Sequence, residues 1–305
     1  MTDRVINFMG ARKIAAAFSI GLVLLSIGSL AVRGLNFGLD FTGGTLVEVV
    51  YEQAEPLSNV RSALAEAGYG DAVVVNFGAD PDVLVRLPQG LSPDLGEQIL
   101  GILQQSAGSE AELRRIEFVG PQVGEELREQ GGLAILLALV VVLIYISMRF
   151  QLKFAFGAVV ALGHDVIIVL GIFSLLRLDF DLTVLGALLA VIGYSLNDTI
   201  VVSDRIRENF RKLRKQPSVD VINVSLSETL GRTMVTSLTT LLVLLALLFT
   251  GGEMIRGFAQ ALTVGIVVGT YSSIYVAANF MLLLGIRQED LMIPEKEGEP
   301  IDDMP

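Results

Sequence analysis

Asp198 is the one charged residue of a long apolar run, residues 182–203, and polar residues surround it in the sequence. These neighbours are Tyr194, Ser195, Asn197 and Thr199. A carboxylate at the centre of a membrane costs roughly 2.5–3.5 kcal/mol on insertion scales, so such residues usually serve a function. The pattern predicts a site that holds a proton or an ion. A hydrogen-bonded contact between helices, or an Asp at the level of the lipid headgroups, is the alternative interpretation.

Arg232 lies directly before another apolar run, residues 233–252, which is rich in hydroxyl side chains such as Thr236 and Thr240. An arginine close to Asp198 would favour the ionised carboxylate, and its withdrawal would favour the protonated one. The two residues would then switch proton binding through a change of conformation. Alternatively, Arg232 extends its charged end to the membrane surface, and the hydroxyls serve helix packing rather than a file of water molecules.

His164 and Asp165 lie about ten residues into the apolar run 154–176, near the middle of its depth. His164 is the only histidine of the chain. Adjacent residues of a helix point about 100° apart, so at most one of the two needs to face Asp198. An unpaired carboxylate at this depth would have to be protonated or hydrogen-bonded. Both residues are secondary candidates for a proton pathway, and a neutral histidine bonded to a neighbouring helix is the alternative.

Six apolar runs are long enough to cross a membrane, since a span needs about 20 mostly apolar residues. They cover residues 14–32, 130–148, 154–176, 182–203, 233–252 and 257–286. The 305-residue chain is 52% hydrophobic and 18% charged, whereas soluble proteins average about 25% charged residues. With a mean hydropathy of +0.63, this composition excludes a soluble enzyme. The first run is long for a signal peptide and no small-residue cleavage site follows it, so we expect a retained helix.

The net charge of −11 lies mostly outside the apolar runs. Residues 33–130 carry 6 Lys or Arg against 16 Asp or Glu, a net charge of −10. Basic residues gather instead before the first run, between the second and third runs, and at 204–215 between the fourth and fifth. By the positive-inside rule, these three places and both termini are cytoplasmic. The domain 33–130 is then outside, where the absence of Cys fits an oxidising compartment.

Four regions follow from these patterns. Residues 1–32 hold the N-terminus and the first span, 33–130 the exterior domain, 131–286 the other five spans, and 287–305 an acidic, disordered cytoplasmic tail. Within the third region, we expect the basic stretch 204–231 to form a helix on the cytoplasmic surface.

The exterior domain alternates strand-like and helix-like patterns in the order βαββαβ. We expect strands at 45–51, 72–77, 83–87 and 112–119, helices at 57–67 and 95–105, and a turn at 78–82. This order suggests a small α+β, ferredoxin-like periplasmic domain, a fold that fixes no function by itself. The sequence has no nucleophile–base pair and no His–carboxylate cluster at metal spacing. We therefore expect neither an enzyme nor a metal or other cofactor.

A glycine-rich segment, residues 34–45, joins the first span to this domain. Its motif residues are Gly38, Asp40, Gly43 and Gly44. Glycines at this density indicate unusual dihedral angles or a close backbone approach. The segment is either an anion-binding turn or a tight structural junction, and it lacks the phosphate-loop pattern that would favour the first.

Together these motifs resemble the SecD/SecF family of protein-export membrane proteins. The resemblance rests on GLDFTGGT (38–45), VIGYSLNDTIVVSDRIREN (191–209), GRTMVTSLTTL (231–241) and IRGFAQALTVGIVVGTYSSIYVA (255–277). Ser203 stands where the family often has Phe. The resemblance implies a multi-pass α-helical protein of the resistance–nodulation–division superfamily, with six spans forming half of a pseudo-symmetric twelve-span assembly. It also implies that Asp198 is the proton-pathway carboxylate and Arg232 the membrane arginine.

The resemblance further implies an auxiliary role in protein export across the bacterial inner membrane. With SecD, such a subunit uses the proton-motive force to move proteins through the SecYEG channel after SecA has acted. The implied partners are SecD, SecYEG with YajC, SecA indirectly, the unfolded exported polypeptide and membrane lipid, with no nucleic acid. One alternative is a structural subunit that stabilises SecD and the channel without conducting protons. A small-molecule efflux subunit is the other, although efflux pumps usually have twelve spans and two large exterior loops.

Overall fold

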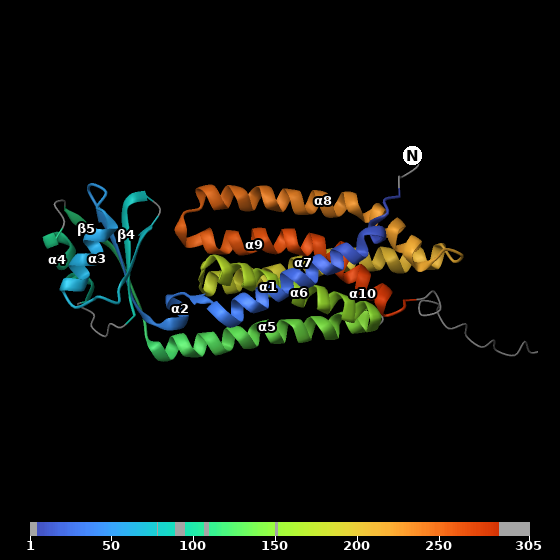
Figure 1. The fold of residues 1–305 in the computed structure, drawn as a ribbon, viewed down its shortest axis with the longest axis horizontal. Coiled ribbons are helices and arrows are strands. Elements are labelled where there is room, and N and C mark those ends of the chain that lie inside the picture. Colours follow the sequence, from blue (N-terminus) through green and yellow to red (C-terminus); the bar gives the residue numbers. More distant parts are fainter. Residues whose placement is uncertain (1–4, 78, 89–94, 107–109, 150–151, 287–305) are drawn as a thin grey trace, which may run out of the picture.

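The computed structural model describes residues 5–77, 79–88, 95–106, 110–149 and 152–286. Six long helices form a bundle, and a four-stranded sheet with two helices lies beyond one end of it, far from the N-terminus (Figure 1). The expected acidic tail, 287–305, lies outside the described residues.

Helices that are long and apolar enough to cross a membrane cover the six apolar runs, except for a few residues at the ends of the last two runs, which confirms the six predicted spans. The helices are α1 (Arg12–Arg33, after the 3-10 turn η1, Phe8–Ala11), α5 (Pro121–Arg149), α6 (Leu152–Leu176), α7 (Leu182–Lys212), α8 (Ser218–Thr250) and α9 (Glu253–Ser272). The chain continues from α9 through the π-helical turn η2 (Ser273–Ala277) into α10 (Ala278–Leu283). Several helices extend beyond the apolar runs because polar residues with good helix propensity continue them.

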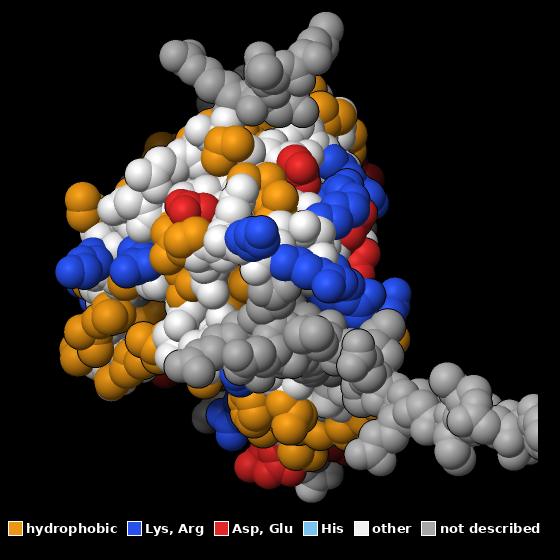
Figure 2. Space-filling view, turned by 90° about the vertical axis from the view of Figure 1, so that its right-hand side faces the viewer, with side chains coloured by type: hydrophobic (Ala, Val, Ile, Leu, Met, Phe, Trp, Pro, Cys, Tyr) orange, Lys and Arg blue, Asp and Glu red, His pale blue; other side chains and the backbone are white. Residues whose placement is uncertain are grey.

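The basic stretch 204–231 is not the separate surface helix that we expected. Residues 204–212 continue α7, and α8 starts at Ser218 after a short turn that ends in Pro217. Proline fixes φ and disfavours a helical conformation in the residue before it, so the break falls there. The two helix ends form a hairpin at the end of the bundle away from the sheet, where Lys and Arg side chains gather (Figure 2).

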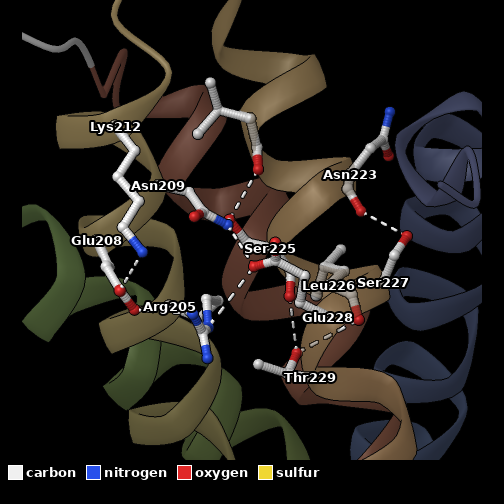
Figure 3. A network of polar contacts seen from close by, with 11 residues as sticks. Arg205, Glu208, Asn209, Lys212, Asn223, Ser225, Leu226, Ser227, Glu228 and Thr229 are labelled. Carbon is white, nitrogen blue, oxygen red and sulfur yellow. Dashed lines mark hydrogen bonds and ion pairs between the residues drawn. The ribbon is translucent and has the colours of Figure 1, made fainter. Parts of the chain in front are cut away.

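A partly buried polar network holds the two arms of this hairpin together (Figure 3). Asn209 of α7 donates to Ser225 Oγ at 3.0 Å and to Glu228 Oε2 at 2.7 Å, both on α8. The N-terminal segment joins the same hairpin, because the Met9 N–H donates to Asn223 Oδ1 at 2.9 Å. These bonds hold α8 against α7 at the end of the bundle away from the sheet.

The α+β domain between the first two spans has the predicted βαββαβ order. Its elements are β2 (Gly44–Tyr51), α3 (Leu57–Glu66), β3 (Val73–Phe77), β4 (Ala79–Leu87), α4 (Leu95–Ser106) and β5 (Ala111–Val119). The strands lie in the order β3-β4-β2-β5, with every neighbouring pair antiparallel, as in a ferredoxin-like sheet. One face of each helix, for example Val60 and Leu64 of α3, packs on the apolar face of the sheet.

Most of the predicted turn at 78–82 belongs to a strand in the structure. Gly78 lies outside the described residues, but residues 79–82 belong to β4, and Asp82 pairs with Val50 of β2. We predicted a turn here because of Pro81, since proline is rare inside sheets. Here it falls in an irregular part of the β3–β4 pairing, between Ala79 and Val83, where no β3 partner needs its missing N–H.

Tyr51, at the end of β2, is only 2% exposed, and its hydroxyl has no hydrogen-bond partner among the described residues. Burial, with a smaller contribution from Glu55, raises the pKa of Tyr51 to about 12. The folded domain therefore keeps this proton while the unfolded chain, with a tyrosine pKa of about 10, releases it. Between about pH 10 and pH 12, the free energy of unfolding should fall by on the order of 2–3 kcal/mol.

We expect Tyr51→Phe to remove this loss, since phenylalanine fills the same space and has no proton to release. Tyrosinate absorbance of the purified chain, titrated to alkaline pH, should lack its latest step in the variant. The same substitution at Tyr69, in the same domain, should leave that step in place. A late step that survives Tyr51→Phe would contradict the assignment.

Candidate functional site

Asp198 lies near the middle of α7 and is 7% exposed. Two hydroxyls from other helices donate to its carboxylate, one to each oxygen. Thr233 Oγ1 of α8 donates to Oδ1 at 2.7 Å, and Ser273 Oγ of η2 donates to Oδ2 at 2.7 Å. The carboxylate therefore joins three helices, and within the described residues it has no hydrogen bond or ion pair to a cationic group.

A second buried carboxylate, Asp165 of α6, has hydrogen bonds to three side chains and is fully buried. Its Oδ1 bonds to His164 Nδ1 at 2.9 Å. Its Oδ2 accepts from Ser195 Oγ of α7 at 2.5 Å and from Ser272 Oγ of α9 at 2.8 Å. Asp165 is thus hydrogen-bonded, as its depth required, and it binds two neighbouring helices.

Two glycines of α9, Gly265 and Gly269, allow a close helix approach that brings Ser272 and Ser273 to the two buried carboxylates. A Cβ at Gly265 would lie 2.2 Å from Val191 Cγ2, and one at Gly269 would lie 3.0 Å from Ser195 Cβ. Small residues four apart allow two helix backbones to approach closely. The same closeness places Ser272 against α6 and Ser273 against α7, because adjacent helical residues point about 100° apart.

The predicted polar neighbours of Asp198 divide between several contacts. Ser195 bonds to Asp165 rather than to Asp198, and Thr199 is fully buried with no hydrogen-bond partner for Oγ1 among the described residues. Tyr194 is half-buried and its hydroxyl lies 3.4 Å from Ser237 Oγ. Asn197 is exposed. Among the described residues, none of these four predicted neighbours donates a hydrogen bond to the Asp198 carboxylate.

Arg232 is exposed, and its side chain makes no hydrogen bond or ion pair with the part of the chain that the structure describes. The next residue, Thr233, contacts Asp198 in its place. Thr236 is exposed and Thr240 is partly exposed, and their hydroxyls donate to backbone carbonyls of α8. The structure thus brings Thr233 to Asp198 and leaves Arg232 outside the buried cluster.

Sequence reasoning missed Ser272 and Ser273, which complete the two buried clusters. Their signal was modest: two consecutive hydroxyls late in the last apolar run. The π-helical turn that begins at Ser273 was not predicted either. Such turns occur frequently at functional sites.

The glycine-rich segment forms a tight junction between the bundle and the domain. Within it, α2 (Leu39–Thr42) follows β1 (Asn36–Phe37), which pairs in parallel with β6 (Asp179–Phe180). Asp40 Oδ2 accepts from the Leu182 N–H at 3.0 Å, at the start of α7.

The glycines of this junction are required by its geometry. Gly43 and Gly44 have φ values of 68° and 125°. A Cβ at Gly44 would lie 2.4 Å from the Leu87 carbonyl oxygen, and one at Gly38 would lie 3.0 Å from Asp181 Cβ. These contacts support the structural interpretation of the motif.

Comparisons with known proteins agree with these features. The family profile described as "Protein export membrane protein SecD/SecF, C-terminal" matches residues 99–287, and the "SecD/SecF GG Motif" profile matches residues 28–55. The chain is 54% identical to protein translocase subunit SecF of Vibrio alginolyticus, over 99% of this chain and 98% of that protein. It is 55% identical to the SecF subunit of Pseudomonas aeruginosa, over 98% of both chains.

Two solved structures resemble the whole arrangement of domain and bundle. One is a crystal structure of SecDF, a translocon-associated membrane protein, from Thermus thermophilus, with a TM-score of 0.85 and 41% identity over 92% of this chain. The other is SecDF in a "Super-membrane-facing form", with a TM-score of 0.71 and 42% identity over 93% of this chain. In both cases the chain spans 39% of the SecDF chain that it matches.

Proposed function

The chain belongs to the SecD/SecF family of protein-export membrane proteins, and from this membership we propose that it is an auxiliary subunit of the Sec translocase. Together with SecD, it uses the proton-motive force to promote late steps of export through SecYEG across the inner membrane. Its relatives are named as translocase subunits, and the steps driven by protons are our inference.

The observation that carries this proposal is the buried Asp198, held by hydroxyls from α8 and η2. Each hydroxyl donates to one oxygen of the carboxyl group. When the carboxylate takes up a proton it loses its charge and gains a hydrogen, so at least one of these bonds must change direction or break. Because the donors lie on two other helices, uptake and release of the proton alter the contacts among α7, α8 and η2.

The free energy available per proton suits a conformational step. One elementary charge that crosses 100 mV releases about 2.3 kcal/mol. This biases an equilibrium between two conformations by roughly 50-fold, whereas unfolding a stable domain takes about 5–15 kcal/mol. The proton flow can therefore move the exterior domain on an emerging chain, but it cannot unfold a stable substrate.

The exposed Arg232 supports an assembly with a second membrane subunit. A charged residue within a membrane protein usually faces a bundle interior or a water-filled cavity rather than lipid. The matched SecDF chains contain more than twice the length of this chain. We propose that SecD covers this side of α7 and α8 and that Arg232 approaches Asp198 only in some conformations of the pair.

Export into membrane vesicles whose lumen corresponds to the periplasm tests the proposal. The chain is reconstituted with its SecD partner and SecYEG, and export is started with SecA and ATP. An imposed gradient with the acidic side in the lumen should accelerate the late phase of export, and the reversed gradient should not. Equal export under both gradients would contradict proton-driven action.

A further inference from the structure

His164 and Asp165 form a second buried ionisable pair that the proposed role of Asp198 leaves unused. His164 is 7% exposed and lies at the centre of α6. With a hydrogen on Nδ1 donated to Asp165, its other ring nitrogen, Nε2, is an acceptor, and Nε2 is buried without a partner among the described residues. A buried acceptor with no donor is costly, so a free lone pair here is the place where a proton would be bound.

We propose that the His164–Asp165 pair is a second proton-binding station, placed in series with Asp198 and coupled to it through the consecutive serines Ser272 and Ser273. The inference deepens the proposed function and rests on it for the direction of proton flow.

The two stations lie at different depths of the bundle. Asp165 precedes the end of α6 at Leu176 by about 11 residues, or roughly 17 Å of helix. Asp198 follows the start of α7 at Leu182 by about 16 residues, or roughly 24 Å. Both of these helix ends lie at the side of the exterior domain (Figure 1). A proton that moves inward from that side therefore reaches Asp165 before Asp198.

Each serine of the pair has two acceptors within hydrogen-bond distance of its one hydrogen. Ser272 Oγ lies 2.8 Å from Asp165 Oδ2 and 3.1 Å from the Gly269 carbonyl oxygen. Ser273 Oγ lies 2.7 Å from Asp198 Oδ2 and 3.0 Å from the Thr270 carbonyl oxygen. The hydrogen can therefore point to the carboxylate while it is ionised and to the carbonyl once a proton has neutralised the charge.

This arrangement couples the stations mechanically, because the two serines are neighbours on one helix. A proton from water on the domain side binds to Nε2, which makes an imidazolium beside the Asp165 carboxylate and changes the charge of the pair from −1 to 0. The attraction between Asp165 and the Ser272 hydroxyl then weakens. Any rotation of α9 that follows also moves Ser273, and so changes the hydrogen bond that Ser273 donates to Asp198. Release of the proton to water restores the first state.

Few other ionisable groups face the pair. The elements packed on α6 are α1, α5, α7, α9, η2 and α10. From α9, Tyr271 stacks on His164 with ring centroids 6.3 Å apart, and Tyr275 of η2 lies beside Tyr271. From α7 comes Asp198, and α10 has no ionisable residue. The charged residues of α1 and α5 lie near the helix ends, and Tyr145 of α5 is exposed. After Asp165, which contacts the ring directly, Asp198 is therefore the charge that should influence His164 most.

Nitrogen-15 NMR of the histidine ring tests the proposal directly, since His164 is the only histidine of the chain. The chain is labelled with [15N]histidine, purified without a polyhistidine tag, and reconstituted in lipid with unlabelled SecD. The single imidazole signal should change from neutral ring to imidazolium as the pH falls. In Asp198→Asn, the midpoint should move to lower pH by about one unit, a tenfold loss of proton affinity, as for two coupled sites.

The serine pair has its own variants and control. Ser273→Ala should reduce the effect of Asp198→Asn on the His164 midpoint, and Ser272→Ala should do the same. Ser29→Ala removes another buried hydroxyl, which bonds to Ser174 and to no carboxylate, and should leave the coupling intact. A ring that stays neutral at every pH at which the complex is folded would overturn the proposal, as would an identical midpoint in Asp198→Asn.

The export assay separates this proposal from the proposed function. Asp165→Asn should reduce gradient-driven export and change its pH profile, while Asp165 as a merely structural residue would alter yield without changing the profile. If Asp198→Asn stops gradient-driven export but Asp165→Asn exports with the wild-type profile, the second station is refuted and the proposed function stands. If Asp198→Asn exports normally, the proposed function fails, whatever the NMR titration shows.

Discussion

Asp198→Asn should abolish the stimulation of export by the proton gradient while leaving the protein folded and bound to SecD. Asparagine has nearly the same shape as aspartate, and its carbonyl oxygen can still accept from Thr233. Its amide group can donate to Ser273 Oγ, which is able to turn its hydrogen to the Thr270 carbonyl oxygen. The variant therefore resembles the protonated carboxylate at all times, and it has no proton to exchange.

The expected loss is complete for the gradient-dependent part of export, and the part driven by SecA and ATP should be unchanged. Export into vesicles with and without the gradient measures the first, and copurification with SecD measures assembly. Asp204→Asn is the matched control, because it removes a carboxylate from an exposed position of the same helix, six residues later. Normal stimulation in Asp198→Asn, with intact assembly, would favour the alternative of a structural subunit that stabilises SecD and the channel without conducting protons.

The long apolar runs made the six spans predictable, and the strand-like and helix-like patterns of residues 45–119 made the βαββαβ order predictable. Hydropathy reports directly which segments belong in lipid, and the β-branched residues of β2 favour a strand. Helix ends were less predictable, since polar residues such as those at 204–212 extend α7 as readily as they would form a loop. The hairpin appears in the structure because long-range bonds such as Asn209 to Glu228 hold it.

The sequence singled out the two buried carboxylates, Asp198 and Asp165, but not the hydroxyls of other helices that donate to them. A carboxylate in an apolar run is easily recognised in the sequence. The hydrogen-bond donors to Asp198, however, lie 35 residues away at Thr233 and 75 residues away at Ser273. Which hydroxyls face it depends on the rotation of each helix about its axis, where one residue changes the direction by about 100°. That rotation is set by packing between helices, and it separates Thr233 from the exposed Arg232.

Gly265→Ala should therefore damage the site from a distance, because it acts on the packing that orients the donors. The added Cβ would lie 2.2 Å from Val191 Cγ2 and 2.7 Å from Cγ1, so α9 must move away from α7. Overpacking of this kind typically costs about 1–3 kcal/mol or more. Ser272 and Ser273 lie about two turns further along the chain and would move with α9, away from Asp165 and Asp198.

Thermal stability in detergent and gradient-driven export should both fall in Gly265→Ala. Gly163→Ala is the matched control: the same change on α6, where nothing lies within 4 Å of the added carbon, should be neutral or slightly stabilising. Val191→Ala combined with Gly265→Ala removes Cγ1 and Cγ2, the two atoms nearest to the added carbon, and should restore export in part. Wild-type stability in Gly265→Ala, or no rescue by Val191→Ala, would show that close contact between α7 and α9 does not position the serines at the two carboxylates.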